Sequence, residues 1–347
     1  MTMISKLRGR TQVARLAAAA VAAAGLAAGV AACGSSSSAN GGGASHMSLV
    51  AYSTPGPAYT DKLIPAFQQT KSGQGASFST SFGASGDQSR AVEAGQPADV
   101  VHFSLLTDME RLVDDGIVPK TWDQNQYHGF VEDSVVTFVV RKGNPKGIHT
   151  WDDLVKPGVE IVTPNPFSSG SARWNLMAAY GAQLQEGKSP AQAQAFLKEL
   201  LQHTVVQPAS GADALSTFTS GKGDVLLSYE NDAIAAKKAG DDIDYVTPND
   251  TILIQTPLAA TKDAPPQASD FVKWLYTPEA QQLWADEGYR PVVKSVFDKN
   301  KSKFTNPSDI FTIDSLGGWD KAAVKFFDPT NGVVTGYEQD LGVSVSG

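Results

Sequence analysis

The sequence predicts an α/β fold that is divided between two domains. Short apolar segments alternate along the chain with amphipathic segments, as strands alternate with helices in α/β proteins. Several of the apolar segments are rich in Val and Ile, which is typical of strands buried on both faces of a mainly parallel sheet. About 300 residues follow the N-terminal region, which is long for a single hydrophobic core. The chain shows no internal sequence repeat.

Eight segments have the character of buried strands. They are Leu49–Tyr52, Asp99–Phe103, Ser134–Val140, Val159–Thr163, Thr204–Gln207, Asp224–Ser228, Tyr245–Thr247 and Ile252–Leu258. Helix starts are indicated by capping residues that precede a proline. Ser189 and Pro190 supply an N-cap and a first helical residue, and Thr277 and Pro278 do the same. Gly288 is expected just beyond the end of the second of these helices.

The N-terminal 33 residues have the layout of a lipoprotein signal peptide. Residues 1–15 carry four basic residues and no acidic one, and residues 16–32 form an apolar run that is short for a membrane span. The run ends in VAACG, which resembles the bacterial lipobox. The resemblance implies that Cys33 receives diacylglycerol and a fatty acid such as palmitate, and becomes the first residue of the mature chain. The alternative is a secreted protein in which Cys33 is unmodified.

The segment after the cysteine is expected to be a flexible tether, residues 34–46, because most of it contains only Ser, Gly, Ala and Asn. A lipid on Cys33 would then hold the protein at the outer, extracytoplasmic face of the membrane. Since Cys33 is the only cysteine, the chain has no internal disulfide and no cysteine metal site.

The charge of the predicted mature chain argues against nucleic acid or an anionic lipid surface as a partner. Removal of residues 1–33 leaves 24 basic against 36 acidic residues, a net charge of about −12. The global field of such a protein does not attract anions. Any anion site must therefore be built from local hydrogen-bond donors.

Four small, polar, glycine-containing turns have the character of strand ends, and three of them follow segments named above. The four turns are Tyr52–Gly56, Phe82–Gly86, Asn165–Ser171 and Ala209–Ala212. In open α/β sheets, ligands bind beyond the carboxyl ends of the strands, at helix starts. Free backbone N–H groups and the helix dipole favour an anion there. One such turn indicates only helix capping, whereas four of them predict that some converge on one anion.

The same turns carry a resemblance to a known family. The motifs are RKGNPK at 141–146, IHTWDDL at 148–154, KPGV at 156–159, TPNP at 163–166 and SGSARWN at 169–175. Further motifs are GDVLL at 223–227, EN at 230–231, GYRPV at 288–292, FTID at 311–314 and GGW at 317–319. The chain resembles the prokaryotic sulfate- and thiosulfate-binding proteins of ABC importers over nearly all of its predicted mature length.

The resemblance implies a periplasmic-binding-protein type II fold, in which two α/β lobes close on the ligand. Lobe 1 is expected to hold 47–137 plus 255–347, and lobe 2 to hold 138–254. Two crossovers are expected near Val136–Arg141 and Thr251–Leu258. The implied function is to capture sulfate outside the cytoplasm and deliver it to the permease subunits. The protein is expected to act as a monomer without a cofactor or metal, and not as an enzyme.

The resemblance also implies which residues bind the anion. They are Thr54, Ser85, Gly170, Ser171, Ala212 and Tyr229, and Arg173 is expected to support the loop from behind without touching sulfate. Three of these depart from the family pattern, because Thr54 replaces aspartate, Ser171 replaces glycine and Tyr229 replaces tryptophan. A phenol donates from a different point than an indole and, unlike an indole, can also accept a hydrogen bond. Thiosulfate, molybdate and other tetrahedral oxyanions therefore remain alternatives.

A site of donors alone selects sulfate. Near neutral pH sulfate has no proton and only accepts hydrogen bonds, whereas phosphate keeps an O–H that needs an acceptor. Leaving that proton unpaired in a buried site costs about 1–3 kcal/mol. Asp87 and Asp213 lie close to the turns in sequence and would admit phosphate if they pointed inward. We expect both to face solvent, because they fall in first helical turns.

Two other function classes are weighed against a binding protein. For an enzyme, the chain lacks HExxH and GxSxG, and SGKG at 220–223 lacks the hydroxyl residue that a P-loop requires. The five histidines contain no i, i+4 pair, and a satisfied or surface role is expected for each: His46, His102, His128, His149 and His203. A cell-wall adhesin is the third class. The tryptophans could form a sugar-stacking set, but core packing is expected for most of them.

Overall fold

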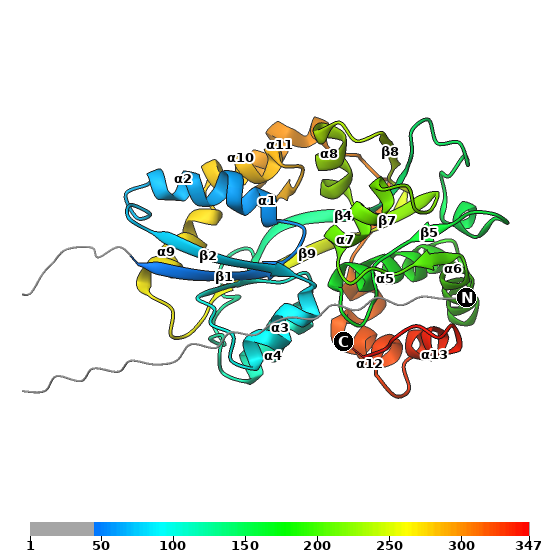
Figure 1. Ribbon diagram of the computed structural model, residues 1–347, viewed down its shortest axis with the longest axis horizontal. Helices are drawn as coiled ribbons and strands as arrows, with labels where there is room; N and C mark the ends of the chain where they lie inside the picture. Colours follow the sequence, from blue (N-terminus) through cyan, green and yellow to red (C-terminus); the bar gives the residue numbers. More distant parts are fainter. Residues whose placement is uncertain (1–44, 347) are drawn as a thin grey trace, which may run out of the picture. The chain divides into compact units, whose positions relative to one another are not determined.

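The computed structural model describes residues 45–346 of the chain (Figure 1). Cys33, the predicted signal peptide and residues 34–44 of the predicted tether lie outside the described residues. The strands are β1 (His46–Tyr52), β2 (Ser77–Gly83), β3 (Val100–His102), β4 (Phe130–Arg141), β5 (Ile161–Val162), β6 (Thr204–Val206), β7 (Val225–Tyr229), β8 (Ile243–Val246), β9 (Asp250–Ala260), β10 (Arg290–Pro291) and β11 (Asp309–Phe311).

The helices lie between these strands. They are α1 (Gly56–Ala58), α2 (Ile64–Gln69), α3 (Ser85–Glu93), α4 (Leu106–Asp114), α5 (Gly170–Gln185), α6 (Pro190–Gln202), α7 (Gly211–Thr219), α8 (Glu230–Ala239), α9 (Pro266–Leu275), α10 (Pro278–Asp286), α11 (Lys294–Asn300), α12 (Gly318–Phe327) and α13 (Val333–Asp340). A π-helical turn, η1 (Tyr59–Leu63), joins α1 to α2, and the 3₁₀ turns are η2 (Trp151–Val155), η3 (Lys301–Lys303) and η4 (Ile313–Leu316).

Two short parallel arrays form the ends of one long sheet. The strand order is β2-β1-β3-β9-β4-β7-β5-β6. We call β2, β1 and β3 the first half-sheet and β6, β5 and β7 the second half-sheet. In each, the strand that comes first along the chain lies in the middle and pairs in parallel with the other two. The two arrays thus share one topology, although the sequence shows no repeat.

The two longest strands, β4 and β9, join the half-sheets. They pair with each other antiparallel, and β9 continues to β3 while β4 continues to β7 and β8. Both overlap the predicted crossovers. The expectation of mainly parallel sheets was wrong for this middle part, because β4 and β9 are antiparallel to each other and to the half-sheet strands they join. The α/β class itself is confirmed.

Strands of both half-sheets are buried on two faces, as their apolar sequences predicted. In β1, Leu49 and Ala51 pack in one hydrophobic cluster, and Val50 between them packs in another. In β7, Leu227 and Leu226 are likewise divided between two clusters. Successive side chains of a strand point to opposite faces, so helices must cover both sides of each half-sheet.

Capping residues place the predicted helix starts correctly. The Ser189 side chain accepts the Gln192 N–H and forms a capping box at the start of α6. The Thr277 side chain accepts the Ala280 N–H at the start of α10. Gly288 follows α10 with φ +93°, the left-handed conformation that favours glycine. Sequence reasoning missed β2, although Phe78 and Phe82 alternate with its Ser residues and pack against a hydrophobic cluster.

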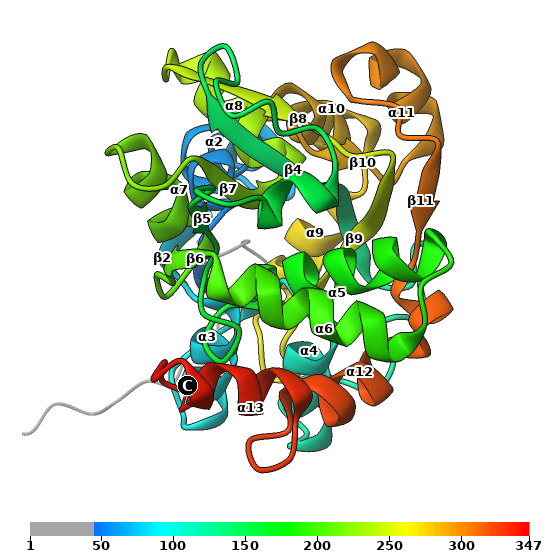
Figure 2. The same cartoon turned by 90° about the vertical axis from the view of Figure 1, so that its right-hand side faces the viewer.

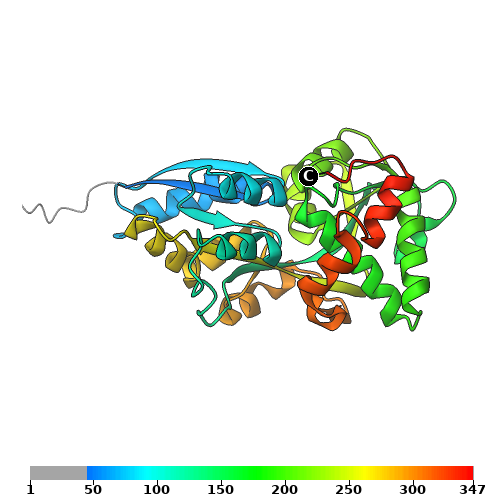
Figure 3. The same cartoon turned by 90° about the horizontal axis from the view of Figure 1, so that it is seen from below.

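The C-terminal helices α12 and α13 pack against α5 and α6 (Figures 2 and 3). Trp319 of α12 meets Trp174 of α5 edge to face, with ring centroids 4.6 Å apart, and both belong to one hydrophobic cluster. The predicted lobes, 47–137 plus 255–347 and 138–254, stay a prediction. The packing of α12 and α13 favours placing them with the second half-sheet. No helix within residues 45–346 has the length and apolarity to cross a bilayer.

Candidate functional site

Polar residues stand where the strands of both half-sheets end. Thr54 lies two residues beyond β1, and Ser85 opens α3 after β2. In the second half-sheet, Gly170 opens α5, and Gly211 opens α7. Tyr229 ends β7 and is the N-cap residue of α8. Because parallel strands place their carboxyl ends at one edge, each half-sheet brings its turns together.

Ser104, which follows β3, contacts residues of α3, α5 and β7. Its N–H donates to Ser85 Oγ at 3.0 Å, and its hydroxyl lies 2.6 Å from the Tyr229 hydroxyl. Its carbonyl accepts the Trp174 indole N–H at 2.8 Å. A Cβ at Gly170 would lie 2.7 Å from Ser104 Oγ, so only glycine fits the start of α5 at this point. The predicted residues Ser85, Gly170 and Tyr229 thus meet around one serine.

Gly211 brings the remaining predicted residues together. A Cβ built there would lie 3.1 Å from Ser171 Oγ and 3.2 Å from Thr54 Oγ1. The next residue, Ala212, donates its N–H to Ser53 Oγ at 3.3 Å. Ser53 and Ala212 also line a groove of about 490 Å³ at the edge of this region. All six predicted ligand residues therefore lie in two adjoining groups, which come from both half-sheets.

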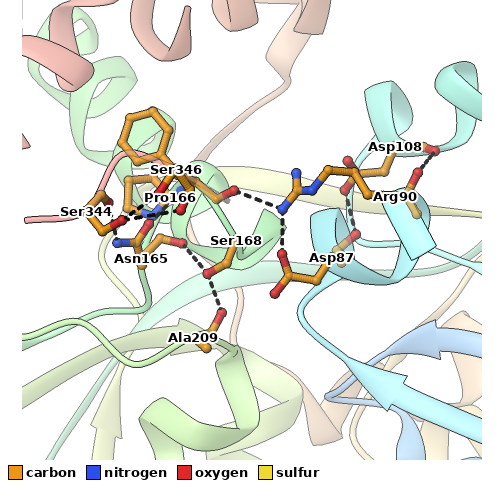
Figure 4. Close-up of polar contacts among 12 residues, drawn as sticks. Asp87, Arg90, Asp108, Asn165, Pro166, Ser168, Ala209, Ser344 and Ser346 are labelled. Carbon is orange, nitrogen blue, oxygen red and sulfur yellow. Dashed lines mark hydrogen bonds and ion pairs between the residues drawn. The ribbon is translucent and has the colours of Figure 1, made fainter. Parts of the chain in front are cut away.

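The loop before α5 is held between the two half-sheets (Figure 4). The Gly86 N–H of α3 donates to the Ser168 carbonyl at 3.0 Å, and the Ser168 hydroxyl donates to the Ala209 carbonyl at 2.7 Å. The Asn165 side chain donates to the Ser344 carbonyl at 3.0 Å. These bonds fix the loop that leads to Gly170, and they join the turns before α3, α5 and α7.

The meeting point is buried and lies at several helix starts. Ser85, Ser104, Ser171 and Tyr229 are at most 5% exposed. The first residues of α3, α5, α7 and α8 all lie in these turns, and the first N–H groups of a helix have no partner inside it. None of the six predicted ligand residues carries a formal charge, since burial raises the pKa of Tyr229 well above its usual range. The positive electrostatic potential at this point therefore comes from helix dipoles and hydrogen-bond donors.

Asp108 is a carboxylate that sequence reasoning did not place near the site. It accepts the Ser85 hydroxyl at 2.7 Å, is 3% exposed, and pairs with Arg111 at 3.2 Å. The Ser85 hydroxyl therefore both donates and accepts a hydrogen bond, because its oxygen also accepts the Ser104 N–H. The expected exposure of Asp87 and Asp213 is confirmed, since both are exposed in the first turns of α3 and α7.

Arg173 lies behind the loop that precedes α5. Its Nε donates to the Pro166 carbonyl at 2.7 Å, and its guanidinium stacks 4.9 Å above the Phe327 ring. Burial lowers the pKa of Arg173, and the Asp108 carboxylate counteracts part of that shift. The predicted role, support of the loop without contact to the anion, stays a prediction.

A neutral hydrogen-bond network lies behind the end of β1. The Tyr52 hydroxyl donates to Glu132 Oε1 at 2.7 Å, and the Thr256 hydroxyl donates to the same atom at 2.5 Å. His102 lies 2.9 Å from the Thr256 hydroxyl. Burial raises the pKa of Glu132 to about 8 and lowers the pKa of His102 to about 3. Near neutral pH both groups are mainly uncharged, so this network does not repel an anion.

Comparison with known proteins shows the family of this chain. The family model of the bacterial extracellular solute-binding proteins matches residues 47–290. A sulfate-binding protein of Synechococcus elongatus is 38% identical over 303 residues, which cover 84% of this chain and 86% of the relative. A thiosulfate-binding protein of Pseudomonas aeruginosa is 32% identical over 299 residues, which cover 80% and 89%.

The chain belongs to the family of the bacterial sulfate- and thiosulfate-binding proteins, within the extracellular solute-binding proteins. The structure of the sulfate-binding protein SubI from Mycobacterium tuberculosis H37Rv superimposes with a TM-score of 0.79 at 45% identity. That match covers 82% of this chain and 99% of SubI. The predicted family and the two-lobed type II fold are thereby confirmed.

Besides Asp108, sequence reasoning missed Ser104 and Ser53. Both follow a predicted buried strand, and Ser104 stands directly after the segment Asp99–Phe103. The signal that could have found Ser104 is its place at the end of a third strand of the same half-sheet. The turn after β3 contains no glycine, unlike the four turns from which an anion site was predicted.

Proposed function

We propose that this protein captures sulfate outside the cytoplasm and delivers it to the permease subunits of an ABC importer. The observation that carries the proposal is the meeting of six uncharged residues from both half-sheets around Ser104 and Gly211. Sulfate accepts hydrogen bonds and donates none, so a buried set of backbone N–H groups at helix starts suits it. Each donor to a charged group contributes about 1.5–3 kcal/mol.

The proposed binding residues are Thr54, Ser85, Gly170, Ser171, Ala212 and Tyr229, with Arg173 behind the loop. Because they lie on both half-sheets, binding would draw the two halves together about the long strands β4 and β9. The burial of Ser85 and Tyr229 supports a ligand that is enclosed when the halves close. We propose that closure, not catalysis, is the functional event, and that the protein acts as a monomer.

The proposal includes a lipid anchor. Acylation of Cys33 and a flexible segment up to residue 46 would hold the protein at the outer face of the membrane, close to the permease. The test is mass spectrometry of the membrane fraction, with the Cys33→Ser variant as the control. A diacylglyceryl-modified N-terminal cysteine supports the anchor. Unmodified Cys33 in a chain released to the medium would contradict it.

Thiosulfate is the second candidate ligand, because the thiosulfate-binding protein of P. aeruginosa is also a relative. A thermal-shift series with sulfate, thiosulfate, molybdate and chloride at matched ionic strength decides among these ions. A ligand at about 100 times its Kd adds about 2.7 kcal/mol of stability, which moves the melting temperature by several degrees. We expect this shift with sulfate and none with chloride. A shift with thiosulfate or molybdate alone would reassign the ligand, and no shift at all would overturn the proposal.

A further inference from the structure

Two buried hydroxyls share a hydrogen bond at the centre of the proposed site. Ser104 Oγ and the Tyr229 hydroxyl lie 2.6 Å apart, and the two residues are 1% and 0% exposed. They come from different half-sheets, Ser104 after β3 and Tyr229 at the end of β7. An indole N–H can only donate a hydrogen bond, whereas each hydroxyl of this pair can both donate and accept one.

The backbone of Ser104 is fixed on both sides. Its N–H donates to Ser85 Oγ and its carbonyl accepts the Trp174 indole N–H, so the residue has little freedom besides the rotation of its hydroxyl. A Cβ at Gly170 would lie only 2.7 Å from Ser104 Oγ. The Ser104 hydroxyl thus lies against the first residue of α5, where the helix dipole favours an anion.

The pair can present either a donor or an acceptor. Two hydroxyls carry two hydrogens, and the bond between them uses one. When Tyr229 donates to Ser104, the Ser104 hydrogen is free to bond an anion oxygen. When Ser104 donates to Tyr229, a lone pair of Ser104 Oγ is free to accept a proton-bearing oxygen. Both directions are compatible with the 2.6 Å separation, because either atom can be the donor.

We propose that the Ser104–Tyr229 pair contacts the bound anion and lets the site take a singly protonated tetrahedral oxyanion, such as hydrogen phosphate, as well as sulfate. This inference rests on the proposed oxyanion site. It makes Ser104 a specificity-determining residue, because its hydroxyl meets either an acceptor oxygen or an O–H group of the ligand.

Two neighbouring groups support this assignment. Asp108, a carboxylate near the site, already accepts the Ser85 hydroxyl and pairs with Arg111, so its oxygens are engaged behind the turn. Burial raises the pKa of Tyr229 well above its usual range, so the phenol keeps the proton that the reversible pair requires. Ser104 Oγ is then an acceptor next to the first residue of α5.

The test compares two anions by calorimetric titration of the full-length protein near neutral pH. The probes are sulfate and inorganic phosphate, measured on the native protein and on Ser104→Ala combined with Tyr229→Trp. This double variant replaces the reversible pair with a donor alone. We expect the native protein to bind phosphate within about a hundredfold of sulfate, and the double variant to lose at least tenfold more affinity for phosphate than for sulfate.

Single variants provide the same test if the double variant fails to fold. Ser104→Ala removes the hydroxyl next to the start of α5 and is expected to weaken phosphate at least tenfold more than sulfate. Tyr229→Phe removes the group that accepts the Ser104 proton when Ser104 accepts the ligand O–H, so it is also expected to weaken phosphate more than sulfate, by a smaller factor. Sulfate binding without phosphate binding in the native protein would overturn this inference and leave the proposed function standing. Equal losses for both anions in Ser104→Ala would also overturn it. Failure of the native protein to bind either anion would overturn both.

Discussion

The first half-sheet and the second half-sheet share a parallel topology, yet they bring different groups to their carboxyl ends. Strands β1, β2 and β3 are followed by side chains with hydroxyls: Thr54, Ser85 and Ser104. Strands β5 and β6 are followed by helices that begin with glycine, Gly170 and Gly211. The first array therefore contributes mainly side-chain groups, and the second contributes mainly backbone N–H groups.

The difference follows from the length and contents of the turns. In the second half-sheet, the start of α5 is in close contact with Ser104, so a side chain at Gly170 has no space. In the first half-sheet, Ser85 Oγ has partners on both sides, Ser104 and Asp108. In the first half-sheet, substitutions should therefore weaken binding by removing side-chain hydrogen bonds. In the second half-sheet, they should weaken binding by steric overlap or by the loss of a backbone N–H.

The largest effect is expected from filling the space at Gly170. Gly170→Val would place a side chain within 2.7 Å of Ser104 Oγ and 2.9 Å of Leu105 Cγ. Overpacking costs about 1–3 kcal/mol, and displacement of α5 removes several donors together, so we expect sulfate affinity to fall about a hundredfold or more. Calorimetric titration measures this. The control is Gly336→Ala on α13, where a Cβ meets no atom within 4 Å. Native affinity in Gly170→Val would place the anion elsewhere.

A smaller effect is expected from removing one hydroxyl in the first half-sheet. Ser85→Ala leaves the Ser104 N–H and the Asp108 carboxylate without this partner. We expect sulfate affinity to fall about tenfold while the protein stays folded, because the position of Ser104 depends on this bond. Titration calorimetry and a melting curve check both parts. Ser79→Ala, on the outer strand β2 and exposed, is the matched control. Unchanged affinity would remove Ser85 from the site.

At the exposed start of α7, the second half-sheet should tolerate a new side chain but not the loss of an N–H. Ala212 is exposed at the second position of α7, where its N–H has no partner within the helix. Ala212→Pro removes that donor in the first turn, where proline is accepted, and should weaken sulfate about fivefold or more. Ala212→Ser keeps the N–H and should stay within about twofold. Equal effects of the two substitutions would contradict a backbone contribution.

The smallest effect on binding, with a clear effect on stability, is expected at Glu132 behind the first half-sheet. Burial raises its pKa from 4.5 to about 8, so the folded state holds a proton that the unfolded state releases. This stabilisation is complete below pH 4.5 and is lost as the pH rises through about 8. Asp133 and Asp232, whose pKa values burial raises to about 7 and about 6, act in the same direction.

Glu132→Gln should therefore flatten the decline of the melting temperature between pH 4.5 and about 8, and leave sulfate affinity near neutral pH within about twofold. Melting curves across this range measure the slope. Glu160→Gln, on the surface, is the control for the loss of one carboxylate. A slope equal to that of the native protein would show that Glu132 does not hold its proton in the folded state.

Most elements could be inferred from the sequence for reasons that are local, whereas the six proposed ligand positions were implied by the family resemblance. Apolar runs indicate buried strands such as β7, and a capping residue before a proline indicates the starts of α6 and α10. Strand β2 was missed although Phe78 and Phe82 alternate with Ser residues, whereas the direction of β4 and β9 could not be inferred in this way. The direction in which two strands pair depends on which distant strand lies alongside, and the sequence of a short apolar run does not indicate that direction.

The α/β class, the family and the turns that end the strands of this protein follow from its amino-acid sequence. Which side chains meet at those turns depends on how the chain folds. Ser104 and Asp108 lie in one segment, and their partners Tyr229 and Ser85 lie 125 and 23 residues away along the chain. Contact between such residues arises from the packing of two half-sheets, and packing across a domain leaves no local pattern in the sequence.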